Sequence, residues 1–109
     1  MIYITQLIYI KPGKEAIFDQ FEDVAIPLIG RYNGQLLFRL RPGPENFIGP
    51  SAVSAESEEH PGDHPYEIHV VRFESEADFE LFKADKERGS FLHLKEESVR
   101  KILLIKGVE

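Results

Sequence analysis

The sequence predicts an α+β protein of the ferredoxin-like type, in which helices cover one face of a four-stranded antiparallel sheet. Three observations lead to this prediction. The segments follow the order β-α-β-loop-β-α-α-β, they divide into two β-α-β halves, and the 109 residues with 42% hydrophobic and 29% charged side chains are typical of one globular domain, residues 1–109. Right-handed crossovers place the first and third strands at the centre of the sheet.

The first half is predicted to hold a strand, a helix and a second strand. Residues 2–10 are rich in Ile, Tyr and Thr and are apolar on both faces, which is typical of a covered strand. Residues 14–29 repeat apolar side chains at helical spacing, so Gly30 is expected to end a helix whose solvent face holds Asp19, Gln20, Glu22 and Asp23. Residues 35–41 predict the second strand, whose apolar face holds Leu36, Phe38 and Leu40 and whose polar face holds Gln35, Arg39 and Arg41.

The second half begins with a long loop. Residues 42–65 hold five of the seven prolines, and a loop of that length is expected to be either mobile or a functional lid. Residues 66–73 predict the third strand. A capping-box-like start at Ser75 opens a helix to about Arg88 that Gly89 stops, a short helix follows over 90–98, and residues 99–108 form the fourth strand.

Charge and composition exclude several classes of protein. The net charge of −6 makes nucleic acid and anionic membrane poor partners. The chain contains no cysteine, which excludes disulfides, thiolate catalysis and cysteine metal sites. No targeting segment or membrane span is apparent, so a cytoplasmic protein is expected.

The sheet itself predicts a partner. Helices cover one face of a ferredoxin-like sheet, yet the first strand is apolar on both faces and the fourth contains the run Ile102-Leu103-Leu104-Ile105. A monomer would expose a large apolar patch. We therefore expect an isologous homodimer with the two sheets back to back, and the alternative is a monomer with an apolar sheet face.

Three blocks of sequence, in this order and spacing, resemble the dimeric α/β-barrel superfamily. They are residues 8–14 entering the first helix, residues 27–35 leaving it, and Val70 to Ser75 followed by Phe79 and Phe82. Within that superfamily the chain is most similar to the small uncharacterised proteins related to the antibiotic-biosynthesis monooxygenases. The resemblance implies a homodimeric barrel. The superfamily includes cofactor-free oxygenases, haem-degrading oxygenases, lactone isomerases and members without known activity, so the resemblance implies one of these. The haem-degrading relatives usually place a tryptophan against the haem, and the lack of tryptophan here makes a haem oxygenase a poor match.

Familiar catalytic and cofactor motifs are missing from the sequence. It contains no P-loop, no dinucleotide-binding glycine motif, no nucleophile elbow and no H-E-x-x-H. His60 and His64 lie four residues apart beside carboxylates, but Pro61-Gly62 prevents the helix that would bring them together. We expect no metal and no cofactor.

The candidate site is built around the third strand. His69 lies inside that strand, and Glu67 is on the same face, so we predict His69 as a general base with Glu67 beside it. Arg39, Gln6, Tyr3, Tyr32 and His93 are the candidate ligand-binding residues, which would suit an anionic or phenolic molecule. The alternative interpretation is a structural histidine whose hydrogen bonds are satisfied by its neighbours.

Three functions follow from these features, and they stay open at this point. The first is an uncharacterised dimer that binds a small aromatic or anionic molecule. The second is a cofactor-independent monooxygenase or isomerase acting on a small aromatic or quinone-like substrate. The third is an interaction protein that uses residues 42–65 as a docking arm.

Overall fold

A computed structural model describes residues 1–48 and 64–108. The strands are β1 (Ile2–Ile10), β2 (Gly34–Leu40), β3 (Glu67–Phe73) and β4 (Val99–Val108), and the helices are α1 (Glu15–Leu28), α2 (Glu76–Lys83), α3 (Lys86–Ser90) and α4 (Leu92–Ser98), with short 3-10 helices η1 (Ile29–Tyr32) and η2 (Pro44–Asn46). Most of the predicted loop 42–65, including His60, lies outside the described residues.

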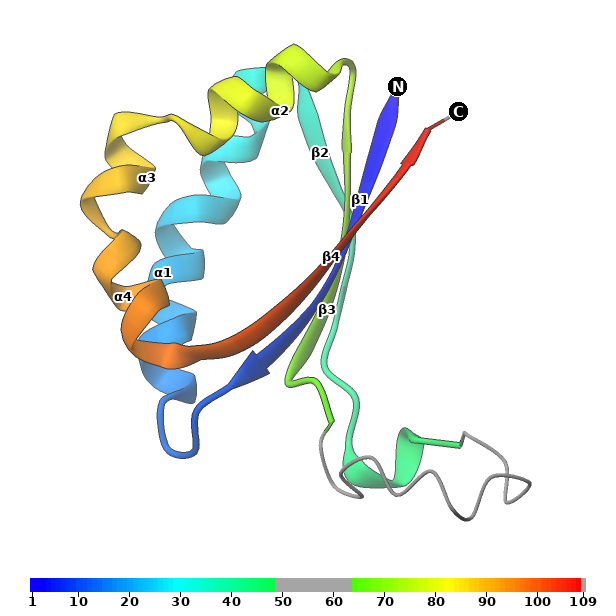
Figure 1. The fold of residues 1–109 in the computed structure, drawn as a ribbon, viewed down its shortest axis with the longest axis vertical. Coiled ribbons are helices and arrows are strands. Elements are labelled where there is room, and N and C mark those ends of the chain that lie inside the picture. Colours follow the sequence, from blue (N-terminus) through cyan, green and yellow to red (C-terminus); the bar gives the residue numbers. More distant parts are fainter. Residues whose placement is uncertain (49–63, 109) are drawn as a thin grey trace.

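The sheet topology confirms the predicted ferredoxin-like arrangement. The strand order is β2-β3-β1-β4 and every pair is antiparallel, with β1 and β3 at the centre. Figure 1 shows the four α-helices on one side of the sheet, with the other side uncovered. No helix in the described part of the chain is long and apolar enough to cross a membrane.

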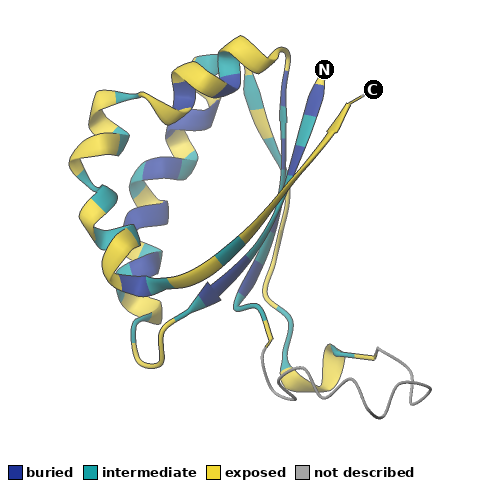
Figure 2. Cartoon of the chain, in the orientation of Figure 1, coloured by how far each residue is buried: buried dark blue, intermediate teal, exposed yellow. Residues whose placement is uncertain are grey.

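The core lies between the sheet and the helices, as Figure 2 shows by the buried segments that face each other across this layer. One cluster of buried residues joins the ends of β1 and β3 to α1, η1 and α2, and a second joins β1 to α1 near α4. Strand alternation directs Ile4 and Ile8 of β1, and Val71 and Phe73 of β3, to this side. The polar residues Gln6 and His69 are cross-strand partners between them, so they share the same face.

Several helix boundaries differ from the sequence prediction. Gly30 does not end the first helix, because the chain continues through η1 and turns only at Asn33, whose φ of 57° is left-handed. The helix predicted over 75–88 is two helices, since the Asp85 side chain accepts a hydrogen bond from the Arg88 amide and starts α3. Gly89 therefore lies within α3 rather than after a helix, and the next helix begins at Leu92 rather than at residue 90.

The predicted alternation of β2 is also wrong at one position. The register shifts between Leu36 and Phe38, which is a bulge that adds a residue to one strand of the pair. Leu36 consequently packs into the core, whereas Phe38 and Leu40 point to the uncovered face. The same shift leaves Arg39 opposite His69, on the side of the helices.

The uncovered face of the sheet is rich in exposed apolar side chains. Phe38 and Leu40 of β2 are more than half exposed, and Leu103 and Ile105 of β4 are 44% and 55% exposed. Leu103 and Ile105 lie opposite Leu7 and Thr5 of β1, so they belong to this face. Figure 2 shows β4 exposed along most of its length.

Candidate functional site

Three ionisable residues meet under the helices. Glu67 and His69 are two residues apart on β3, so strand alternation directs both side chains toward α1. Glu22 comes from the facing side of α1, and all three are at most 5% exposed. His69 Nε2 contacts Glu67 Oε2 and lies 2.9 Å from Glu22 Oε2. The imidazole is therefore held between two buried carboxylates.

Arg39 of β2 and Arg41, which follows the end of that strand, bind the outer oxygens of these carboxylates. Arg39 donates from Nε to Glu67 Oε1 at 3.2 Å and from Nη2 to Glu22 Oε1 at 3.1 Å. Arg41 donates from Nε to the same Glu67 oxygen at 2.5 Å and from Nη2 to Asp19 at 2.7 Å. The network thus gives Glu67 three cationic partners, which is what a fully buried carboxylate requires.

The surroundings separate the protonation states of the three groups. Burial raises the pKa of Glu22 to about 7, against the lowering effect of its hydrogen bond with His69. Burial disfavours charge on His69 and Glu67 as well, but their hydrogen bonds outweigh it. The pKa of His69 rises to about 9, and that of Glu67 falls below its ordinary value. Near pH 7 His69 carries a proton, Glu67 is ionised and Glu22 exchanges between its two forms.

A cavity of about 60 Å³ adjoins this cluster between the sheet and the helices. Glu22, His69 and Gln6 form part of its wall, whereas Glu67 does not reach it. The rest of the lining is mainly apolar and includes Ile4, Ile8, Phe18, Phe21, Ala25, Val71, Phe73, Phe79, Phe82 and Ile102. A mostly apolar cavity with a few convergent polar groups is the usual form of a small-molecule site.

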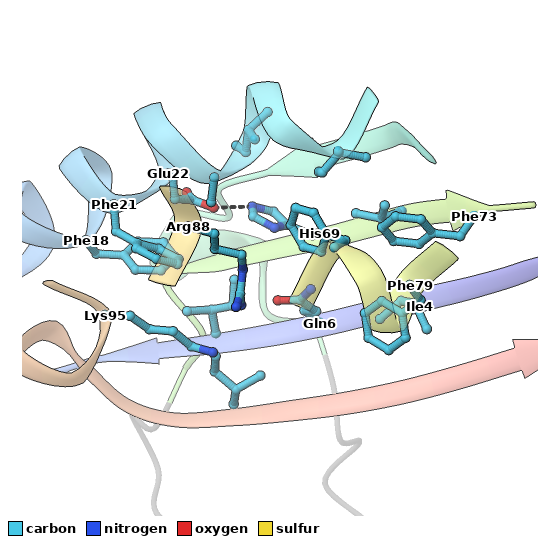
Figure 3. Close-up of a pocket in the computed structure, with 17 residues that line it drawn as sticks. Ile4, Gln6, Phe18, Phe21, Glu22, His69, Phe73, Phe79, Arg88 and Lys95 are labelled. Atoms are coloured by element: carbon cyan, nitrogen blue, oxygen red, sulfur yellow. Dashed lines mark ion pairs between the residues drawn. The ribbon is translucent and has the colours of Figure 1, made fainter. Parts of the chain in front are cut away.

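Two cationic side chains reach the same cavity. Arg88 of α3 and Lys95 of α4 both line it, and Figure 3 shows them extending toward Gln6 and β1. The pKa of each is lowered, first by burial, and for Lys95 also by the charge of Arg88. The wall of the cavity therefore contains both an acid–base pair and two cationic side chains.

A metal ion could bind between Glu22, Glu67 and His69 in place of the proton on His69. Glu22, Glu67 and His69 offer one ligand atom each, all within 4.8 Å of one another, and two carboxylates with one imidazole form a donor set that divalent metals accept. However, Arg39 and Arg41 already bind the same carboxylates. Their positive charges repel any further cation, and they repel a divalent metal ion about twice as strongly as the single charge of a proton on His69, which the two carboxylates favour.

The structure brings some predicted site residues together and separates others. His69, Glu67, Arg39 and Gln6 lie together, because Arg39 and Gln6 are the cross-strand partners of His69. The three other candidate ligand-binding residues do not line the cavity beside this group. Tyr3 lies on the opposite sheet face, where its partner is Arg72; Tyr32 donates a hydrogen bond to Asp85 away from the cavity; and His93 is exposed on α4.

The sequence reasoning missed Glu22, Arg88 and Lys95. Glu22 was expected on the solvent face, yet it lies four residues after Phe18 and three before Ala25, which is the spacing of the buried stripe of α1. Lys95 similarly lies four residues after Phe91 and three before the buried Ser98. Helical spacing could have identified both positions, whereas Arg88 depends on the break between α2 and α3.

Comparisons with known proteins support the fold. No model of a protein family matches the sequence, and a comparison with curated proteins found no match. Among solved structures, the RPA0582 protein, of unknown function from Rhodopseudomonas palustris, is 15% identical in its methylated form. It superposes with a TM-score of 0.75 over 99% of this chain and 79% of its own.

Two further structures show the same architecture. An uncharacterised NIPSNAP domain protein from Burkholderia xenovorans is 11% identical, with a TM-score of 0.66 over 100% of this chain and 94% of its own. A protein from Bacteroides fragilis, described as dimeric, of unknown function and of ferredoxin-like fold, is 9% identical, with a TM-score of 0.67 over 99% and 95%. At these identities the similarity establishes the ferredoxin-like fold alone.

Proposed function

We propose that this protein binds a small aromatic molecule in the cavity between the sheet and the helices. The observation that carries the proposal is the Glu22–His69 pair in the wall of a cavity lined by phenylalanines. Aromatic walls favour a flat apolar ligand, and the pair offers a carboxyl group and a charged imidazole to a phenolic or carbonyl oxygen. The cavity is partly open, so a ligand larger than its enclosed volume extends toward the opening.

Proton transfer on that ligand is the second candidate function. A carboxyl with a pKa of about 7 can both accept and donate a proton near neutral pH, which is the property of a general acid–base catalyst. Glu22 is then the proton acceptor in place of His69, whose proton is held by two carboxylates. Since both carboxylates contact Nε2, His69 would stabilise the developing oxyanion through its other ring N–H, at Nδ1, and Glu67 would position His69, as in a cofactor-independent isomerase or monooxygenase.

Ligand binding is tested by thermal unfolding with phenols, quinones and aromatic acids. A ligand at about 100 times its dissociation constant adds about 2.7 kcal/mol, which raises the midpoint by about 4–8 °C for a chain of this size. Ala25→Leu fills the cavity and is expected to abolish the shift, because Ala25 lines it. Ala77→Leu, which makes the same change on the exposed side of α2, is the control.

A shift that persists in Ala25→Leu would place the ligand elsewhere, and no shift from any compound would contradict the proposal. Glu22→Gln separates the two candidate functions. It is expected to leave binding of neutral aromatics within about threefold while abolishing proton exchange from a bound C–H acid, followed by deuterium incorporation. Unchanged exchange in Glu22→Gln would exclude Glu22 as the base.

We also propose that two copies of the chain associate through the uncovered sheet face. The exposed side chains Phe38, Leu40, Leu103 and Ile105 support this, because monomeric proteins rarely expose a contiguous apolar patch of this kind. The Bacteroides fragilis protein with the same fold is described as dimeric. Equivalent faces of two copies would form an isologous interface.

Sedimentation equilibrium tests the dimer. The wild-type protein is expected to have twice the chain mass, and the double variant Leu103→Lys, Ile105→Lys is expected to sediment as a monomer, because two lysines from each copy would face each other across a buried interface. The matched control is Leu81→Lys on α2, where the leucine is 56% exposed on the helical side. A wild-type protein that remains monomeric at 100 μM would refute the interface.

A further inference from the structure

Three side chains that line the cavity, Arg88, Lys95 and Gln6, have hydrogen-bond donors without an acceptor among the described residues. The Arg88 Nε atom is buried and has no hydrogen-bond partner. Arg88 donates from Nη1 to the Lys83 carbonyl at 3.2 Å, which leaves Nε free. For the Lys95 ammonium and the Gln6 amide, the described residues provide neither a hydrogen bond nor an ion pair. Of the three side chains, Arg88 has the donor that is fully buried, and a buried donor without an acceptor is costly, which indicates a missing partner for Arg88 Nε.

The positive charges of Arg88 and Lys95 in the cavity wall are not neutralised by a paired carboxylate in the described part of the chain. Arg88 lies over the rings of Phe21 and Phe82, with its guanidinium carbon 5.7 and 5.1 Å from their centroids. Aromatic faces position a guanidinium but do not neutralise it as a carboxylate would. Asp85 raises the pKa of Arg88 and Glu96 raises that of Lys95, but burial, which lowers both pKa values, has the larger effect.

We propose that Arg88, Lys95 and Gln6 bind the carboxylate of an aromatic acid, an inference that rests on the proposed function because it names the chemical class of that ligand. A carboxylate has two oxygens and about four acceptor sites, enough for all three donors. Its negative charge would relieve the repulsion between Arg88 and Lys95. The aromatic ring would then lie along the phenylalanines that line the cavity (Figure 3).

Calorimetric titration with benzoate and benzamide tests this inference, because the two compounds have the same shape and differ in charge. The wild-type protein is expected to bind benzoate at least tenfold more tightly than benzamide. Lys95→Met is expected to weaken benzoate at least fivefold and to leave benzamide unchanged. Lys86→Met, which removes an exposed lysine from neighbouring α3, is expected to change neither.

The thermal stability of the protein without ligand is measured alongside the titration. Lys95→Met removes a cation without a partner, so its thermal midpoint is expected to lie at or above that of the wild-type protein; Lys95→Gln serves as the second variant if the methionine does not fold. Equal affinities for benzoate and benzamide, or equal weakening of both in Lys95→Met, would overturn the inference while the proposed aromatic site stands. Binding of neither compound would also overturn it, and the phenol and quinone screen then decides the proposed function separately.

Discussion

Glu67→Ala is expected to lower the free energy of unfolding by about 3–5 kcal/mol, the range found when one partner of a buried ion pair is removed. Glu67 is fully buried and accepts hydrogen bonds from Arg39 and Arg41 while contacting His69. Its removal leaves the charge on His69 with one carboxylate instead of two. A domain of this size is stabilised by about 5–15 kcal/mol in total, so the variant approaches the limit of folding. Urea denaturation followed by circular dichroism measures the loss.

Two further variants serve as references for the loss of unfolding free energy in Glu67→Ala. Glu80→Ala removes an exposed carboxylate that pairs with Lys83 on α2, and surface pairs contribute about 0–1 kcal/mol. Glu67→Gln keeps the shape and an acceptor oxygen but removes the charge, so its loss should fall between those of the two alanine variants. A loss below about 1 kcal/mol in Glu67→Ala would mean that Glu67 is not needed to balance the charges of β2 and β3.

The fold could be predicted from the sequence because the strands carry their own signals. The Ile, Tyr and Thr content of β1, the β-branched run of β3 and the helical stripe of α1 each identify an element, and handedness then fixes the strand order. The break between α2 and α3 could not be predicted in the same way. It depends on Asp85 capping the Arg88 amide, and a single aspartate among charged residues gives a weak signal.

The candidate site could be predicted only in part, because some of its residues are brought together by partners that are distant in sequence. Strand alternation places Glu67 with His69, and strand pairing adds Arg39 and Gln6. Glu22, by contrast, is charged and was assigned to solvent on that ground, although its helical position faces the core. Its burial is tolerated because Arg39 and His69 compensate its charge, and these partners are distant in sequence. A buried charge cannot be recognised before its partners are known.

The free energy of unfolding is expected to fall as the pH rises from about 5 to 9. The pKa of Glu22 is about 7 in the folded protein and 4.5 as an isolated side chain, so the folded state holds a proton that the unfolded state releases between these values. His69, with a pKa of about 9 against 6.5, does the same at higher pH. Each proton held only by the folded state contributes a slope of about −1.4 kcal/mol per pH unit.

Glu67 acts in the opposite direction. Because its pKa is lowered, the stability that it contributes is present above pH 4.5 and is lost as the pH falls further. The maximum of stability is therefore expected near pH 5, and urea denaturation at pH intervals of one unit from 4 to 9 locates it.

Glu22→Gln identifies the group responsible for the first part of the decline. Glutamine resembles the protonated carboxyl and cannot ionise, so the slope between pH 5 and 7 should largely disappear. The slope between pH 7 and 9 should also become smaller, since the hydrogen bond with Glu22 helps to raise the pKa of His69. An identical pH profile in the wild-type protein and the variant would show that Glu22 ionises as an ordinary carboxylate. That result would remove the physical basis for a proton acceptor at this position.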